Sequence, residues 1–371
     1  MIFHVVAPSY APITKERATC PFVGLTLRFC QMMHSLGHTV VHYGAEGSEV
    51  AGEQVTVVSA AEQKQWFGQY EPEQLPNVDW SGRAVYWTIY NQRVLDEIKK
   101  RAAPHDFVCL LIAQNSWIVD QLPKTVLPVA YAIGHDAPFA PFRVYASYSN
   151  LHRFLGASLP PMWYHAVIPH YFDPNDFPLQ KKKKDYFVFM GRLCAIKGLE
   201  IAVQVCKKLG VKLMIAGPGA KSYTPRRLVY NAGVITGDIE YVGCVNGDRR
   251  AQLLGEAQGC FAPSQCTEGF CNVAVEAQLT GTPAITTDWG GFVDTVEHGK
   301  TGYRCRTLDH FLFAARNVHT LDSQYIHDRA VAKYSMDNVR YRYQEYFQML
   351  SDSWQGGWDT ERERTQLDWL L

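Results

Sequence analysis

Features that mark several common classes of protein are missing from this sequence. Its 371 residues carry 36 Lys and Arg against 36 Asp and Glu, so the net charge is zero. A nucleic acid partner requires a cationic surplus, which is absent here. No apolar run reaches the roughly 18 residues of a membrane-spanning helix, and Phe107–Ala113 is far shorter. We therefore expect no nucleic acid partner and at most a peripheral membrane contact.

The cysteines and the first residues argue against secretion. None of the ten cysteines belongs to a CxxC pair, and several lie in apolar segments, among them Cys109 and Cys206. This distribution is typical of reduced thiols that pack as small hydrophobic side chains. The apolar run at the first residues is short, ends before Pro8 and follows no cation, unlike a secretory signal. The sequence therefore predicts a cytoplasmic location.

Several catalytic and metal-binding signatures are also missing. The sequence contains no GxSxG, no HExxH, no DxD and no His/Cys/Asp cluster with metal-ligand spacing, so we expect no metal and no cofactor. Two partial matches fail at a required glycine. The dinucleotide fingerprint resembled by Gly217–Ser222 needs glycine where Ser222 stands, and the P-loop resembled by His298–Thr301 needs glycine where Asp294 stands.

What the sequence does contain is a repeated alternation of apolar strand patterns and amphipathic helix patterns. Hydrophobic residues make up 47% and charged residues 19%, enough apolar surface for a core. Continuous apolar strands joined by helices predict parallel sheets covered on both faces. The pattern restarts after a Pro-rich, Lys-rich stretch near residues 172–184. We predict Rossmann-like α/β domains at 1–172 and 173–345, with a helical tail at 346–371 that crosses back to the first domain.

Ligands of such sheets bind at the loops that follow the strands. The strand Tyr186–Gly191 is followed by the loop GRLCAIKG, which contains Arg192 and Lys197. Two cations in one strand-to-helix loop suit a diphosphate, with Arg as a fork and Lys as a point charge. The alternative is a pair of solvated surface cations, which the helix dipole disfavours at a helix start.

The densest group of candidate residues lies in PSQCTEGFCNVAVEAQLTGTPAI. Glu268 and Glu276 are separated by the seven residues GFCNVAV, and a helix is predicted from about Cys271. The N-terminus of that helix would present backbone N–H groups to an anion. A phosphate flanked by two carboxylates that bind hydroxyl groups describes a sugar nucleotide. The alternative is that Glu268 is a helix N-terminal charge and Glu276 a surface residue.

Six segments together resemble glycosyltransferase family 4, whose members are retaining, sugar-nucleotide-dependent enzymes of the GT-B fold. The resemblance is dense from about Val167 to Arg306 and thinner in the first half. The segments, in order, are VIPHYFDPNDF, GRLCAIKG, IAGPG, YVGCV, PSQCTEGFCNVAVEAQLTGTPAI and GGFVDTVEHGKTGY. A GT-B protein has two Rossmann-like domains that face each other across a deep cleft.

The resemblance implies catalytic and donor-binding roles in the second half. Arg192 and Lys197 match the cations that hold the donor diphosphate and stabilise the leaving group. Glu276 matches the glutamate that binds the ribose. Glu268 matches the one that contacts the transferred sugar; it positions that sugar, and a role as acid or nucleophile is the alternative. Three further residues match the segment whose main chain contacts the sugar and the phosphate: Phe270, Cys271 and Asn272.

Other positions match more weakly or depart from the family. Val245 matches a position near the nucleobase, and His135 a first-domain histidine near the donor sugar. Gly24 matches a glycine near the phosphates, although Val23 stands where a second glycine is usual. His170 and Asp294 replace a common Asn and Glu, and both lie outside the donor motifs.

The resemblance implies metal-independent transfer of a hexose from a nucleoside-diphosphate sugar, with UDP-glucose as the first expectation and GDP-mannose as the second. The acceptor (carbohydrate, lipid or protein) is expected at first-domain loops, Ser9–Val23 and Trp66–Arg83. Two alternatives remain. A nucleotide-dependent oxidoreductase would need a good dinucleotide fingerprint. A catalytically dead sugar-nucleotide-binding GT-B protein would have lost Arg192, Lys197, Glu268 or Glu276.

Overall fold

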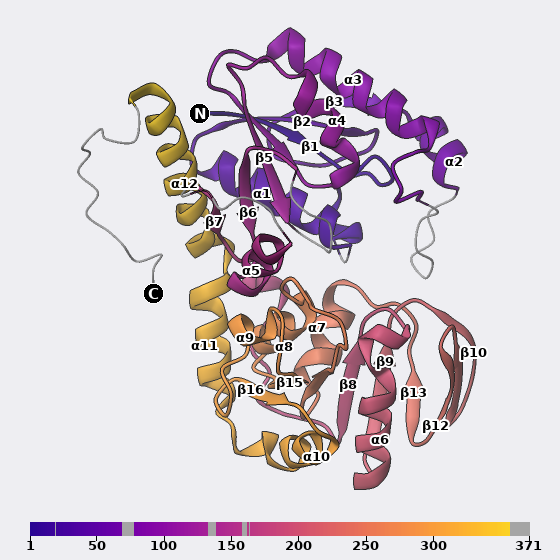
Figure 1. The fold of residues 1–371 in the computed structure, drawn as a ribbon. Coiled ribbons are helices and arrows are strands. Elements are labelled where there is room, and N and C mark those ends of the chain that lie inside the picture. Colours follow the sequence, from indigo (N-terminus) through magenta and orange to yellow (C-terminus); the bar gives the residue numbers. More distant parts are fainter. Residues whose placement is uncertain (19, 69–77, 133–138, 158–161, 163, 357–371) are drawn as a thin grey trace.

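The structure is a computed structural model. It describes residues 1–18, 20–68, 78–132, 139–157, 162 and 164–356. These residues form two α/β domains, one above the other in Figure 1, as the alternating sequence patterns predict.

The first domain contains a parallel sheet of seven strands. Because β1 pairs with both β2 and β4, the strand order reverses direction at β1 and β4. Such a reversal opens a crevice at the carboxyl edge of a sheet, where ligands bind. The strands, in spatial order, are β3 (Glu53–Val58), β2 (Thr39–Ala45), β1 (Ile2–Val6), β4 (Phe107–Leu110), β5 (Leu127–Ala132), β6 (Phe142–Tyr145) and β7 (Ala166–Val167).

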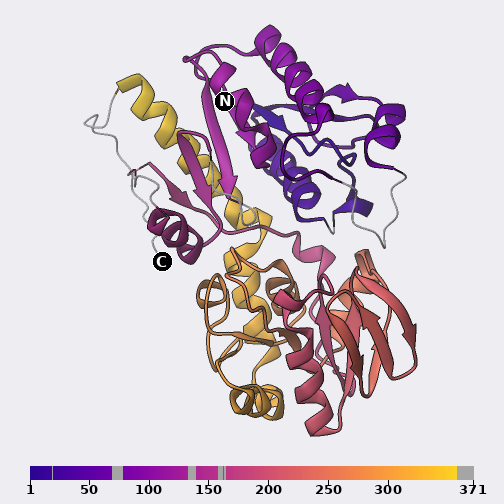
Figure 2. The ribbon, with the colours of Figure 1, turned by 45° about the vertical axis from the view of Figure 1, so that its right-hand side comes forward.

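The second domain repeats this plan with six parallel strands and adds a small antiparallel sheet. The parallel strands, in spatial order, are β13 (Ile239–Tyr241), β9 (Lys212–Ala216), β8 (Tyr186–Met190), β14 (Cys260–Ala262), β15 (Ala284–Thr287) and β16 (Gly302–Cys305). The small sheet consists of β10 (Ala220–Thr224), β11 (Arg227–Tyr230) and β12 (Gly233–Thr236). Figures 1 and 2 show it on the outer side of the second domain, away from the last helix.

Helices cover both sheets, which explains why the central strands are apolar along their whole length. Those of the first domain are α1 (Pro21–Ser35), α2 (Ala60–Phe67), α3 (Val85–Arg101), α4 (Ser116–Gln121) and α5 (Tyr148–Gly156). Those of the second domain are α6 (Leu199–Leu209), α7 (Gly247–Gly255), α8 (Asn272–Leu279), α9 (Phe292–Thr295), α10 (Leu308–Asn317) and α11 (Ser323–Tyr334). Within the ranges given above, no helix is long and apolar enough to cross a membrane.

A last helix, α12 (Met336–Gly356), runs from the second domain onto the first (Figure 1). Phe347 is fully buried in the first core, with its ring 4.6 Å from Phe3 and 4.8 Å from Phe107, centre to centre. Met336, at the start of the helix, already packs against this core, ahead of the expected start of the tail at residue 346. Apolar burial of α12 therefore couples the two domains.

The carboxyl edges of the two sheets face each other. Ser147, two residues after β6, donates a hydrogen bond of 2.6 Å from its hydroxyl to the carbonyl oxygen of Gly269, between β14 and α8. The loop after β1 also faces the second half of the chain, because Lys15 pairs with Asp176 at 2.9 Å. The strand-following loops of both domains thus meet at one junction.

Candidate active site

The loop that follows β8 lies against two neighbouring loops of the second domain. Gly198 has a φ of +70°, and a Cβ atom there would approach the Pro263 carbonyl oxygen to 2.1 Å. Gly217 has a φ of +132°, and its Cβ would lie 2.0 Å from the carbonyl oxygen of Gly191. Only glycine fits such positions. These close approaches place the GRLCAIKG loop beside the loop that contains Glu268.

Lys197 and Glu268, both predicted site residues, are in direct contact. The ammonium group of Lys197 donates a hydrogen bond to Glu268 Oε1, and the Ser264 hydroxyl donates to the same oxygen at 2.5 Å. Glu268 is only 7% exposed. Burial alone would lower the pKa of Lys197, but the Glu268 carboxylate outweighs it and the pKa is raised. Lys197 is therefore a fixed cation, and Arg192, exposed in the same loop, is a second one.

The N-terminus of α8 follows directly after Glu268. Its N-cap residue, Cys271, has a φ of +73°, a left-handed backbone that non-glycine residues rarely adopt. Such strain is maintained only where surrounding structure imposes it, often at ligand sites. The side chain of Phe270 is buried, with its ring 4.6 Å from the His170 ring and 5.5 Å from the Tyr334 ring. Only the main chain of Phe270 is left to face a ligand.

Two consecutive glycines, Gly290 and Gly291, pack against the backbone of the segment that begins at Glu268. A Cβ atom on Gly290 would lie 2.9 Å from the backbone N and O of Glu268, and one on Gly291 would lie 2.8 Å from the carbonyl oxygen of Gly269. The backbone N–H of Gly291 donates to the carbonyl oxygen of Glu268 at 2.8 Å. The GGF motif thus lets the loop after β15 pack directly on the main chain of the Glu268 segment.

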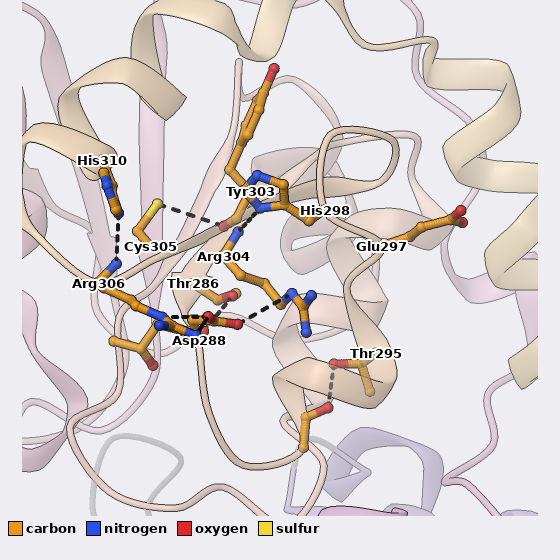
Figure 3. Close-up of polar contacts among 12 residues, drawn as sticks. Thr286, Asp288, Thr295, Glu297, His298, Tyr303, Arg304, Cys305, Arg306 and His310 are labelled. Carbon is orange, nitrogen blue, oxygen red and sulfur yellow. Dashed lines mark hydrogen bonds and ion pairs between the residues drawn. The ribbon is translucent and has the colours of Figure 1, made fainter.

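Residues on either side of the segment GGFVDTVEHGKTGY form a separate polar cluster with His298, which lies within it (Figure 3). Asp288, just after β15, accepts a 2.6 Å contact from Arg306 and lies 3.5 Å from Arg304 Nε. His298 Nδ1 accepts a hydrogen bond from the backbone N–H of Arg304 at 3.1 Å. Figure 3 shows these groups holding the start and end of β16. The segment that resembles a P-loop is therefore a structural turn.

Glu276 lies in the second turn of α8, where it is buried. Its Oε2 atom accepts hydrogen bonds from Arg250 Nε at 2.8 Å and from Arg250 Nη2 at 2.5 Å. Arg250 belongs to α7, and Val245, partly buried, lies in the loop that leads into that helix. The structure thus places the predicted ribose and nucleobase positions on neighbouring segments, with Arg250 as a partner that sequence reasoning missed.

The first-domain predictions are less clearly placed. Gly24 is buried in α1, where a Cβ atom would lie 2.4 Å from the carbonyl oxygen of Ala18, so the protein's own backbone fills that space. His135 lies outside the part of the chain that the structure describes. The structure neither adds to nor removes the expected role of His135.

The two departures from the family pattern both lie at the domain junction. His170 Nδ1 donates to Asn272 Oδ1 at 2.7 Å, because an amide oxygen can only accept. Burial lowers the pKa of His170 to about 4, so its ring is neutral at pH 7. Asp294 accepts from the backbone N–H of Ser149 at 3.3 Å. His170 is outside the donor motifs in the sequence, and in the fold its ring contacts Asn272, which belongs to one of them.

The residues that sequence reasoning missed are mostly partners of predicted ones. Ser264 lies within the quoted motif and could have been found as a hydroxyl near Glu268. Arg250 carries no local signal that would separate it from the adjacent Arg249. No group of three or more metal-ligating side chains occurs among the residues that the structure describes.

Comparisons with known proteins agree with this geometry. Residues 184–323 match the family model described as Glycosyl transferases group 1. An uncharacterized glycosyltransferase of Methanocaldococcus jannaschii is 34% identical over 119 residues, which cover 31% of this chain and 30% of that protein. The matches to this and two other curated relatives cover 30–46% of the length of those proteins.

Similarity to solved structures extends over nearly the whole chain. AviGT4, a glycosyltransferase involved in avilamycin A biosynthesis, superposes with a TM-score of 0.68 at 20% identity, over 94% of this chain and 98% of that one. HepE of Anabaena, in complex with UDP and glucose, gives 0.62 at 13% identity, over 94% and 100%. Over 94% of its length the chain thus shares the GT-B fold of these structures, and its residues 184–323 match the family model of Glycosyl transferases group 1.

Proposed function

We propose that the protein is a glycosyltransferase that moves a hexose from a nucleoside-diphosphate sugar to an acceptor with retention of anomeric configuration and without a metal ion. The observation that carries this proposal is the cluster of Lys197, Glu268 and Ser264 beside the N-terminus of α8. The family of residues 184–323 supports it.

The cluster has the charges that departure of a diphosphate requires. Negative charge grows on the β-phosphate as its bond to the sugar breaks, and preorganised cations and N–H groups lower that barrier. Lys197, Arg192 and the first N–H groups of α8 supply both kinds of group, which is why we propose that no metal is needed. A bound diphosphate would compete with Glu268 for the Lys197 ammonium.

The two glutamates take different parts of the donor in this proposal. Glu268, beside Lys197, accepts hydrogen bonds from hydroxyls of the transferred sugar and positions it. Glu276, held by Arg250, accepts from the ribose hydroxyls. We propose UDP-glucose as the first donor to test, since HepE, which has this fold, is solved with UDP and glucose. GDP-mannose comes next.

The acceptor is proposed to bind at the carboxyl edge of the first sheet. The indole of Trp80 is 47% exposed and stacks on Phe22, with ring centres 6.0 Å apart. Tyr10 meets the same indole edge-on at 5.7 Å. Gln114, just after β4, donates to the Trp80 carbonyl oxygen at 2.7 Å, so Trp80 lies where the strand order reverses. An exposed aromatic face at that point suits an acceptor's apolar surface.

All ten cysteines are free thiols in the structure. Free thiols persist in a reducing compartment. On this ground we propose a cytoplasmic site of action.

The two alternatives receive no comparable support. In a dinucleotide-binding domain the glycine-rich loop leads into a helix, whereas Gly217–Ser222 leads into strand β10. A dead sugar-nucleotide-binding protein has no reason to keep Lys197 and Glu268 in contact, as they are here.

A donor panel tests the proposal. The full chain is incubated with UDP-glucose, GDP-mannose, ADP-glucose and UDP-N-acetylglucosamine, with and without EDTA, and release of the nucleoside diphosphate is measured. We expect turnover of one donor that EDTA does not abolish, and NMR of the product should show a retained anomeric configuration. Binding of NAD without binding of any nucleoside diphosphate would overturn the proposal.

A further inference from the structure

Arg28 is a buried cation that forms no ion pair with any of the residues that the structure describes. It lies in the second turn of α1 and is 8% exposed. Its Nε atom makes no hydrogen bond, and no carboxylate pairs with the guanidinium in the ranges that the structure describes. The guanidinium carbon lies 5.4 Å from the centre of the Phe172 ring. Buried charges are normally paired, so this one calls for an anion.

Three other cations near the domain junction are neutralised by carboxylates. Lys197 is held by Glu268, Arg250 by Glu276 and Lys15 by Asp176. Burial lowers the pKa of Arg28, but a guanidinium stays protonated at neutral pH. Arg28 therefore keeps a full positive charge inside the domain junction.

The charge of Arg28 lies within electrostatic range of His170 and of three carboxylates, Glu276, Asp176 and Asp173. The ring of His170 binds Asn272, the first residue of α8, and Glu276 lies in the next turn of that helix. His170 Nε2 is buried there without a hydrogen-bond partner among the described residues. Arg28, from the first domain, thus lies against Phe172, two residues from the histidine that binds the first residue of the helix we propose as the phosphate site.

Gly24 makes this placement of Arg28 possible. A Cβ atom on Gly24 would come within 3.0 Å of Arg28 Nη2 as well as 2.4 Å from the Ala18 carbonyl oxygen. A larger residue at position 24 would push the guanidinium away from the junction. Gly24 then acts through Arg28 rather than by touching phosphate itself.

We propose that Arg28 binds the diphosphate of the donor from the first-domain side, opposite Lys197 and the N-terminus of α8. This inference rests on the proposed function and adds the first domain's own cation to the donor site. An anion held between Arg28 and α8 links the two domains, so donor binding favours the arrangement in which their carboxyl edges meet. The ligand chemistry is a pyrophosphate group.

Calorimetric titration of the full chain tests this proposal with three probes: UDP, uridine and inorganic pyrophosphate. Replacing Arg28 with Met removes the charge and keeps an apolar stem against Phe172. We expect Arg28→Met to weaken UDP and pyrophosphate binding by about tenfold to a hundredfold, because a charged hydrogen-bond partner is lost. Uridine affinity should stay unchanged, and Arg28→Lys should recover part of the loss. Arg93→Met, which removes a surface partner of Glu62 in the same domain, is the matched control.

Thermal unfolding without ligand separates binding from a structural role. Since an unpaired buried charge costs stability, the melting temperature of Arg28→Met should equal or exceed that of the wild type. A lower melting temperature with unchanged UDP and pyrophosphate affinity would show that Arg28 is structural and overturn the inference. Equal losses of UDP and uridine affinity would also overturn it, because Arg28 would then act on the nucleoside.

The two proposals fail in different ways. If the wild type binds neither pyrophosphate nor any nucleoside diphosphate, the proposed function fails and this inference fails with it. If UDP or GDP binds and Lys197→Ala weakens that binding while Arg28→Met does not, only the inference about Arg28 fails.

Discussion

The carboxyl edges of the two sheets carry different side chains, although both consist of loops that follow parallel strands. The edge of the second domain presents ion pairs, Lys197 with Glu268 and Arg250 with Glu276. The edge of the first domain presents rings, with Trp80 stacked on Phe22. Paired charges suit a charged ligand of defined shape, and an exposed ring suits an apolar face. With the function proposed above, this difference supports a division of the reaction in which the second domain holds the donor and the first holds the acceptor.

The largest effect is expected when the charged edge loses its buried cation. Lys197→Ala should lower kcat/KM for the donor by about a hundredfold to a thousandfold, or roughly 3–4 kcal/mol, because charge on the leaving phosphate loses a preorganised partner. The measurement is initial rates of nucleoside diphosphate release. Lys212→Ala removes a lysine from an exposed pair with Glu240, at 2.5 Å, and should leave the rate unchanged. Equal losses in the two variants would argue against a special role for the charged edge.

The second prediction concerns His170, at the junction between the two edges. We expect it to make the free energy of unfolding depend on pH, an effect smaller than that of Lys197→Ala. The pKa of His170 is lowered by burial to about 4, below its ordinary value of 6.5. Below pH 6.5 His170 binds a proton in the unfolded chain but stays neutral in the folded chain. His170 therefore lowers the free energy of unfolding progressively as pH falls from 6.5 to 4. The cost approaches about 3 kcal/mol at the lower limit. Above pH 6.5 it is absent.

The comparison of wild type with His170→Asn measures this effect. Denaturant unfolding at pH 7, 5.5 and 4.5 should show a smaller acid loss of the free energy of unfolding in the variant. His42, whose pKa burial also lowers to about 4, is present in both proteins and drops out of the difference. Parallel pH profiles would show that His170 is not held neutral at the junction.

The smallest effect is expected for a substitution of Trp80, at the edge of the first domain. It should change the KM for the acceptor and not the reaction of the donor with water. Trp80→Ala should raise the acceptor KM by about tenfold, the size of one lost stacking contact with its buried area. Donor hydrolysis should stay unchanged, and Trp80→Phe should lie between the two. Phe313→Ala, at an exposed ring of the second domain (58%), is the control. A change in donor hydrolysis with Trp80→Ala would contradict the division between the edges.

Much of the fold was predictable from local patterns. The fully buried strand Tyr186–Met190 is a continuous apolar run, and α8 begins where its pattern starts, at Asn272. The antiparallel sheet β10–β12 was not predicted, because short exposed strands lack a continuous apolar run. The crossing of α12 was expected, but the point where its packing begins, Met336, depends on which face of the helix meets the first core.

The candidate site was predictable as a set of residues but not as a set of contacts. The sequence placed Lys197 and Glu268 in two separate loops, and their hydrogen bond depends on the close approach of Gly198 to Pro263. Arg250 and Arg28 carry no motif, since their importance lies in which charges surround them. His170 is far from Asn272 in the chain and touches it only across the domain junction.

The chain's local order of apolar runs, glycines and charged residues determined two α/β domains and the residue types available to a diphosphate site. Those properties are local, because backbone conformation and side-chain periodicity depend on near neighbours. Tertiary structure alone decided which charges are neutralised and which, like that of Arg28, remain open. The burial and the ion pairing of a charged side chain depend on residues that are distant in the chain. Together they decide whether that charge is neutralised within the protein or is free to bind a ligand.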